Sequence, residues 1–72
     1  MEIRKRLAKN IQAMREKKNL TQHELAEKSG LSFQTIQKVE HARGWAQDAT
    51  IEAIARALGV DFPHLFKPIK KV

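Results

Sequence analysis

The 72-residue chain has no cysteine, no tyrosine and only one tryptophan. Without cysteine it can form neither a disulfide bond nor a zinc site built on cysteine ligands. It also lacks any apolar run near the roughly 20 residues that cross a bilayer, and its first residues form a charged segment rather than a signal peptide. We therefore expect a cytoplasmic protein that has no contact with a membrane.

Signals for catalysis are missing as well. His23 and Glu24 begin like the HExxH helix of zinc proteases, but Glu27 stands where the second histidine is required. The other two histidines, His41 and His64, have no spacing that indicates a metal site. We therefore predict no enzymatic activity, no metal and no cofactor.

Apolar residues recur with helical spacing along the chain, which predicts an all-α fold with one small core. In the first segment this pattern is made by Ile3, Leu7, Ile11 and Met14. Capping and breaking signals divide the chain into five helices, with Asp61 as the expected cap of the last. Their expected ranges are about 2–17, 22–29, 33–41, 48–58 and 62–66. We place the domain at residues 1–66 and a basic C-terminal tail at residues 67–72.

The second and third helices are expected to meet at a tight turn. Thr21 and Glu24 have the spacing of a capping box, which starts a helix at the next residue. Gly30 can adopt a positive φ after the end of that helix, and Ser32 can cap the helix that follows. Two helices crossing at such a turn also need small and apolar residues at fixed places. These places are filled by Ala26, Leu31, Ile36 and Val39.

The third helix has a polar outer face. With Ile36 and Val39 placed toward the core, the outward side chains are Gln34, Gln37, Lys38 and His41. Glutamine can bond to the edge of adenine, and lysine to guanine or to phosphate. Such residues on a lone helix are ordinary solvated side chains, but beside this turn they indicate a helix that contacts bases in the major groove. Phe33 lies at the flank and could instead fold back onto a neighbouring helix.

The segment from Thr21 to Glu40 resembles the phage repressor/Cro-type helix-turn-helix family, often called the XRE family. Similar residues extend from Leu7 to Leu65, which is most of the chain. The resemblance implies a compact lambda-repressor-like domain that binds double-stranded DNA. It further implies a sequence-specific transcriptional regulator, with repression as the expected mode of action.

The resemblance also implies roles for single residues. The residues that it implies to contact bases are Ser32, Phe33, Gln34 and Gln37. We add Lys38 to this set because it lies on the outward side of the same helix. It implies that Gln22 contacts a phosphate. Further phosphate contacts are expected from Thr21, Thr35, His41, Arg43 and Trp45. Trp45 has an alternative interpretation as a cover over the core.

The same resemblance implies one ion pair and shows one difference from the family in the loop after the third helix. Arg15 is implied to pair with Glu40 in a partly buried salt bridge. Arg15 could equally bind phosphate, but an unpaired Glu40 would repel DNA, so the pair is the better interpretation. The family usually has a glycine two residues beyond this glutamate, where the present chain has Ala42. We expect Gly44 to replace that glycine.

Basic residues outnumber acidic ones by 14 to 8, with an isoelectric point near 10.1, which favours a polyanionic partner. Residues 1–18 hold seven basic and two acidic side chains (+5), residues 19–66 hold four and six (−2), and residues 67–72 hold three basic ones (+3). In the family the start of the first helix lies close to the DNA backbone. We therefore expect phosphate attraction from some of Arg4, Lys5, Arg6 and Lys9, which raises affinity without selecting sequence.

Two further kinds of partner remain open. A single recognition helix covers few base pairs, so a homodimer is expected on DNA, formed through the helix at 62–66 and the tail. The candidate contacts are Phe62, Phe66, Ile69 and Val72, although the two phenylalanines could simply cover the core. The alternative function is a protein-interaction module with an unidentified protein partner, such as an antitoxin-like protein that also binds its own operator.

Overall fold

The computed structural model describes residues 3–44 and 46–67. It contains four α-helices followed by one short 3-10 helix, and the described residues form no strand. The elements are α1 (Ile3–Lys17), α2 (Gln22–Ser29), α3 (Phe33–Glu40), α4 (Asp48–Leu58) and η1 (Phe62–Phe66). The predicted all-α class is therefore confirmed.

The last of the five expected helices is a 3-10 helix and not an α-helix. Pro63 lies in its first turn and supplies no backbone N–H, and segments of this length commonly take the tighter 3-10 form. Asp61 occupies the cap position, but its side chain makes no capping hydrogen bond, contrary to expectation. The third helix ends at Glu40, one residue earlier than expected, and His41 follows it as the C-cap.

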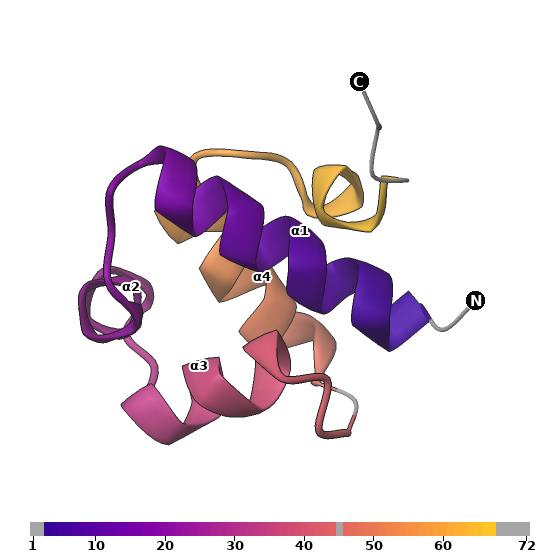
Figure 1. The fold of residues 1–72 in the computed structure, drawn as a ribbon, viewed down its shortest axis with the longest axis horizontal. Helices are drawn as coiled ribbons and strands as arrows, with labels where there is room; N and C mark the ends of the chain where they lie inside the picture. Colours follow the sequence, from indigo (N-terminus) through magenta and orange to yellow (C-terminus); the bar gives the residue numbers. More distant parts are fainter. Residues whose placement is uncertain (1–2, 45, 68–72) are drawn as a thin grey trace.

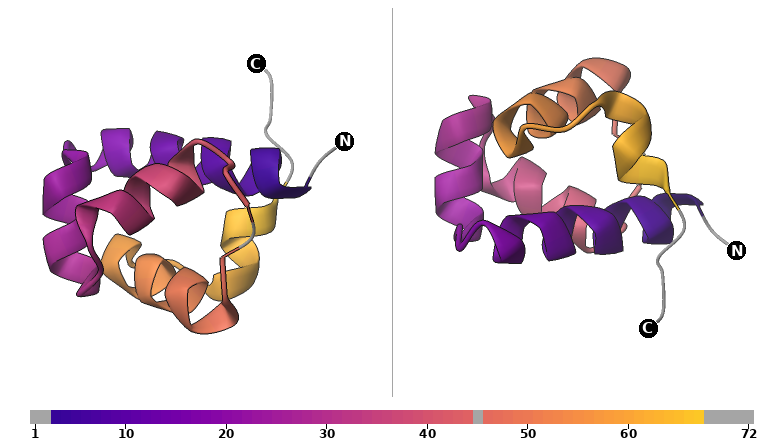
Figure 2. Two further views of the ribbon diagram at one scale, coloured as in Figure 1. Left: turned by 90° about the horizontal axis from the view of Figure 1, so that it is seen from below. Right: turned by 90° about the horizontal axis from the view of Figure 1, so that it is seen from above.

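The helices enclose a single interior (Figure 1). Helix α1 packs against α3, α4 and η1, while α2 packs against α3 and α4. Figure 1 shows α3 along the lower edge of the molecule and η1 at its upper right. In Figure 2, α3 is toward the viewer in the view from below and η1 is toward the viewer in the view from above. The two elements therefore lie on different sides of the molecule.

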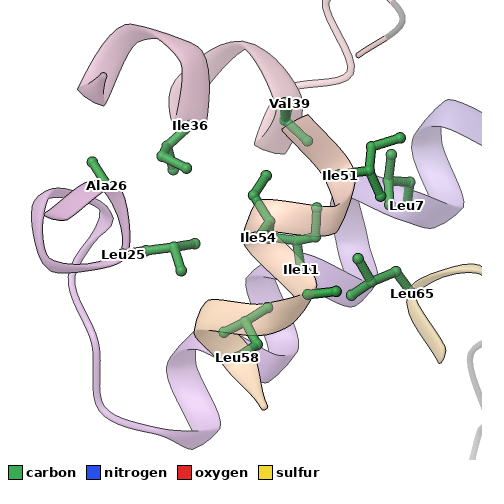
Figure 3. Packing of buried hydrophobic residues seen from close by; sticks show 11 residues of the cluster. Leu7, Ile11, Leu25, Ala26, Ile36, Val39, Ile51, Ile54, Leu58 and Leu65 are labelled. Atoms are coloured by element: carbon green, nitrogen blue, oxygen red, sulfur yellow. The ribbon is translucent and has the colours of Figure 1, made fainter. Parts of the chain in front are cut away.

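The core draws side chains from every element (Figure 3). Its largest fully buried members are Ile11, Leu25, Ile36, Ile51, Ile54, Leu58 and Leu65. Burying each such side chain contributes about 1.5–3 kcal/mol. Met14 is only partly buried, and Ile3 is 52% exposed, so the predicted apolar stripe of α1 continues beyond the edge of the core at its first residue.

The turn between α2 and α3 follows the local signals. The Thr21 hydroxyl accepts the N–H of Glu24 at 3.0 Å, and the Glu24 carboxylate accepts the N–H of Thr21 at 2.8 Å. Gly30 has φ +75°, and the N–H of Leu31 reaches back to the carbonyl of Ala26 at 3.0 Å. This left-handed residue with its 6→1 hydrogen bond is a Schellman motif, which ends α2 and directs the chain into α3.

The same motif ends α3 without a glycine. Ala42 itself takes φ +56°, and the N–H of Arg43 donates to the carbonyl of Lys38 at 3.0 Å. The expectation that Gly44 would replace the usual glycine is therefore wrong. Gly44 also has a positive φ, of +103°, but it lies two residues later in the loop toward α4. The hydrogen bonds that close the end of α3 hold Ala42 in a conformation that disfavours a Cβ atom.

Candidate nucleic-acid interface

A buried carboxylate fixes the orientation of α3. Glu40, the last residue of α3, is only 2% exposed. Its Oε2 accepts the Nε of Arg15 at 2.7 Å, and its Oε1 accepts an Nη2 hydrogen of the same guanidinium at 3.1 Å. Gln22 donates to Oε1 at 3.0 Å, so α1 and α2 both contribute to holding this one side chain. The network joins the three helices that flank the turn.

Arg15 makes a further hydrogen bond besides those to Glu40. Its Nη1 donates to the carbonyl of Leu20 at 2.7 Å, just before α2 begins. The hydrogen bond to Glu40 raises the pKa of Arg15 above its ordinary value, and burial, which lowers this pKa, is a smaller effect. Because the pKa is higher in the folded chain than in the unfolded one, the pairing contributes stability that is lost as the pH rises above the ordinary arginine pKa.

The opposite side of α3 faces solvent. Gln34 and Lys38 are exposed, Gln37 is half-buried, and His41 is exposed directly after the helix. Ser32 caps the helix, because its hydroxyl accepts the N–H of Thr35 at 3.1 Å. The structure therefore brings the expected base-contacting side chains to one end and one side of α3.

Ser32, an expected base contact, and three of the expected phosphate ligands already make hydrogen bonds within the protein. The Ser32 and Thr35 hydroxyls lie 2.8 Å apart and share a hydrogen bond. The Thr21 hydroxyl caps α2, and the Gln22 amide donates to Glu40, as described above. A phosphate contact from these residues would use their remaining donors. Trp45 lies outside the described residues.

Phe33 turns back toward α2 instead of projecting freely. Its ring stacks on the imidazole of His23, with the ring centroids 3.8 Å apart and the planes within 1° of parallel. Phe33 is half-buried, whereas His23 is exposed. The sequence left two interpretations of Phe33 open, and the structure gives the ring a fixed partner on the neighbouring helix.

A hollow of about 270 Å³ lies between α3 and the start of α4. Its lining includes the side chains of Lys38 and Arg43, which bring two positive charges to its rim. The remaining lining residues are Thr35, Val39, Gly44, Ala46, Gln47 and Thr50. The hollow thus joins basic and hydroxyl side chains directly beside the exposed face of α3.

The first turns of α1 add further positive charge. Lys5 and Lys9 are exposed, and Arg6 is half-buried with an Nε that has no hydrogen-bond partner among the described residues.

Within the described part of the chain, no helix is long and apolar enough to span a membrane. No group of three His, Asp or Glu side chains there is arranged to hold a metal ion.

The geometry described so far is that of two short helices joined by a tight turn. The second helix is packed against α1 and α2 on one side and exposes polar side chains on the other. A family model described as helix-turn-helix matches residues 11–65, which includes both helices and most of the core. The chain belongs to the XRE-type helix-turn-helix family.

Related proteins agree with this membership. The chain is 35% identical over 68 residues to an uncharacterized HTH-type transcriptional regulator, y4dJ, of Sinorhizobium fredii, covering 94% of the present chain and 88% of the relative. The crystal structure of a hypothetical transcription factor, NHTF, from Neisseria superposes with a TM-score of 0.89 at 36% identity, covering 93% and 77% of the two chains. The clp gene regulator ClgR of Corynebacterium glutamicum gives a TM-score of 0.83 at 25% identity, covering 90% and 69%.

Several side chains that support this helix-turn-helix domain were not singled out from the sequence. Asn10 is buried and donates to the carbonyls of Leu65 at 2.7 Å and Lys67 at 2.8 Å. Its position on the apolar face of α1 was the available signal, because a polar residue there needs a buried partner. Gln12, which donates to the backbone carbonyl of Glu40, carried no comparable signal. His23 was considered only as the start of an incomplete HExxH motif, which gave no indication of its contact with Phe33.

Proposed function

We propose that this helix-turn-helix protein is a transcriptional regulator that binds double-stranded DNA sequence-specifically, with α3 in the major groove. The observation that carries the proposal is the division of α3 into two sides. Glu40 and the apolar residues hold one side against α1 and α2, while Gln34 and Lys38 on the other side are exposed. A rigidly held helix with exposed amide and ammonium groups suits contacts with base edges.

Base contacts are assigned to the exposed end and side of α3. Under this proposal the residues that contact bases are Ser32, Phe33, Gln34, Gln37 and Lys38. Gln34 and Gln37 carry the amides that can bond bidentately to adenine, and the Phe33 ring can touch a thymine methyl group. Specificity would then depend on side chains that contribute little to the core.

Phosphate contacts are assigned to the residues around α3. The proposed ligands are Thr21, Gln22, Thr35, His41, Arg43 and Trp45. Arg43 has the strongest support, because it shares the hollow beside α3 with Lys38. The exposed Lys5 and Lys9 of α1 would add attraction that depends on salt and not on sequence.

We further propose repression by occupancy of an operator. A domain lying in the major groove denies that stretch of DNA to other proteins, and this mode needs no surface beyond the one that binds DNA. Two linked recognition helices would raise the affinity and the specificity for the operator, because one helix covers only a few base pairs.

A homodimer bound to two half-sites is therefore part of the proposal. Its suggested surface includes η1 and the chain that follows it. Phe62 and Phe66 of η1 pack partly against the core, with their rings 5.4 Å apart, and Ile69 and Val72 lie outside the described residues. The most exposed large apolar side chain of the described residues, Ile3, is on α1, which packs against η1.

The test is selection of bound sequences from a pool of random duplexes, followed by titration of the enriched site at several salt concentrations. We expect an enriched palindrome with half-sites about 34 Å apart, bound by two copies of the chain. An enriched site without symmetry would contradict the dimer and leave specific binding intact. No enrichment would contradict specific DNA binding and favour the alternative of a protein-interaction module.

A further inference from the structure

The His23–Phe33 stack links the two helices of the motif at the face proposed to meet DNA. His23 is the second residue of α2, and Phe33 is the first residue of α3. Their rings are almost parallel and overlap at 3.8 Å between centroids. Among the described residues this is the ring contact that joins α2 to α3, and neither residue takes part in the Glu40 network.

The stack restricts the ring of Phe33. One face of the phenyl group lies against the imidazole, so rotation about its side-chain bonds would separate the two rings. The partner sits on a helix that is capped at Thr21 and packed against both α3 and α4. The orientation of the half-buried Phe33 ring is therefore set before any DNA is bound.

We propose that His23 is a positioning residue for base recognition and acts through Phe33. It holds the phenyl ring in the orientation that touches a thymine methyl group, and so sets the preference at one base pair of the site. This inference rests on the proposed function of α3 as the recognition helix. Preorganisation of this kind improves recognition because the side chain loses less freedom on binding.

The position of His23 makes a purely structural role a weak explanation for the stack. His23 is exposed, and the turn that it spans is already fixed by the capping box, the Schellman motif at Gly30 and the Ser32 cap. The stack adds order mainly to the side chain of Phe33. Its removal should therefore change base preference more than folding.

Three variants test the inference: His23→Ala removes the stack, His23→Phe retains an aromatic partner, and Glu52→Ala, an exposed change on α4, is the control. Each is titrated with the duplex selected by the parent protein, with the same duplex substituted at every position in turn, and with a random duplex. Thermal unfolding and the NMR shifts of the Phe33 ring protons are measured on the free proteins. The ring shifts report loss of the stacked imidazole without DNA.

For His23→Ala we expect altered Phe33 ring shifts and a loss of at least about fivefold discrimination at one base pair, the lower end of what a mismatch normally changes. Affinity for random DNA should be unchanged. His23→Phe should keep the preference, and Glu52→Ala should resemble the parent in every measurement.

Three outcomes would overturn the inference. Unchanged preference at every base pair in His23→Ala would exclude a positioning role while leaving the proposed function of α3 in place. An equal loss of affinity for selected and random duplexes, together with lower thermal stability, would show that His23 acts on the fold alone. Failure of the parent protein to select any sequence would remove the proposed function itself, and this inference with it.

Discussion

The guanidinium of Arg15 and the carboxylate of Glu40 meet through two hydrogen bonds across 25 positions of sequence, with Glu40 almost completely enclosed. The pair joins the last turn of α1 to the last residue of α3. Breaking a buried ion pair by removing one partner leaves an uncompensated charge in the interior. Helix α3 is therefore coupled to α1 through an enclosed ion pair.

For Arg15→Met we expect a loss of about 3–5 kcal/mol in the free energy of unfolding, because the buried Glu40 side chain would be left without its partner. Urea denaturation followed by circular dichroism measures this loss. Lys17→Met, an exposed change on the same helix, should stay within about 0.5 kcal/mol. A loss below about 1 kcal/mol for Arg15→Met would show that the pair is not needed for the fold.

Gln34→Ala and Gln37→Ala should each weaken binding to the selected site by about 1–3 kcal/mol and relax preference at the base pair concerned. The physical reason is the loss of the amide that bonds to a base edge. Titrations with selected and random duplexes check both effects. Glu52→Ala, an exposed change on α4, should leave both affinities unaltered, and an equal loss on random DNA would contradict base contact by α3.

Arg43→Ala should reduce the slope of log affinity against log salt concentration by about 1, because one phosphate contact and its released counterion are lost. The affinity should fall by a similar factor for selected and random duplexes. Arg56→Ala serves as the control, since Arg56 lines a different hollow between α4 and η1. An unchanged slope for Arg43→Ala would remove Arg43 from the phosphate contacts.

Ala42→Gly should stabilise the domain by about 1 kcal/mol, because φ +56° strains a residue that carries a Cβ atom. Thermal unfolding detects the gain as a higher melting temperature. Asn19→Gly is a matched control: Asn19 also has a positive φ, but asparagine tolerates this region, so its gain should be smaller. A melting temperature lowered by Ala42→Gly would show that the left-handed conformation carries no strain.

Asn10→Ala should destabilise the domain by about 1–3 kcal/mol, because the carbonyls of Leu65 and Lys67 lose their shared donor. Hydrogen exchange of the η1 amides should quicken more than that of α2, since Asn10 ties η1 to α1. Lys9→Ala, the exposed neighbour, controls for helix propensity. Equal acceleration in all helices would mean that η1 does not open separately from the rest.

Local chemistry explains why much of the fold was predictable. The capping box at Thr21 and Glu24 and the left-handed Gly30 depend on residues within a few positions of each other, so their spacing alone located α2 and the turn. The Arg15–Glu40 pair came from family resemblance, since spacing does not reveal a contact between residues so far apart. Helical periodicity found the core but extended it to Ile3, because periodicity does not show where a core ends.

Features that depend on distant partners were not predictable. Asn10 meets Leu65 across 55 positions, and only the packing of η1 on α1 brings them together. Ala42 adopts an unfavourable φ because the hydrogen bonds at the end of α3 outweigh its intrinsic preference. The ring of Phe33 had two plausible environments, and the decision between them depended on how α2 and α3 cross.

The side chains that hold α3 and those that face solvent are different residues of one eight-residue helix. Exchanging the exposed Gln34 and Lys38 for those of another family member would leave Glu40, with its partners Arg15 and Gln22, intact. Under the proposed function, related proteins can thus diverge in the operators they recognise by changing a few surface residues, while the interior scaffold stays the same.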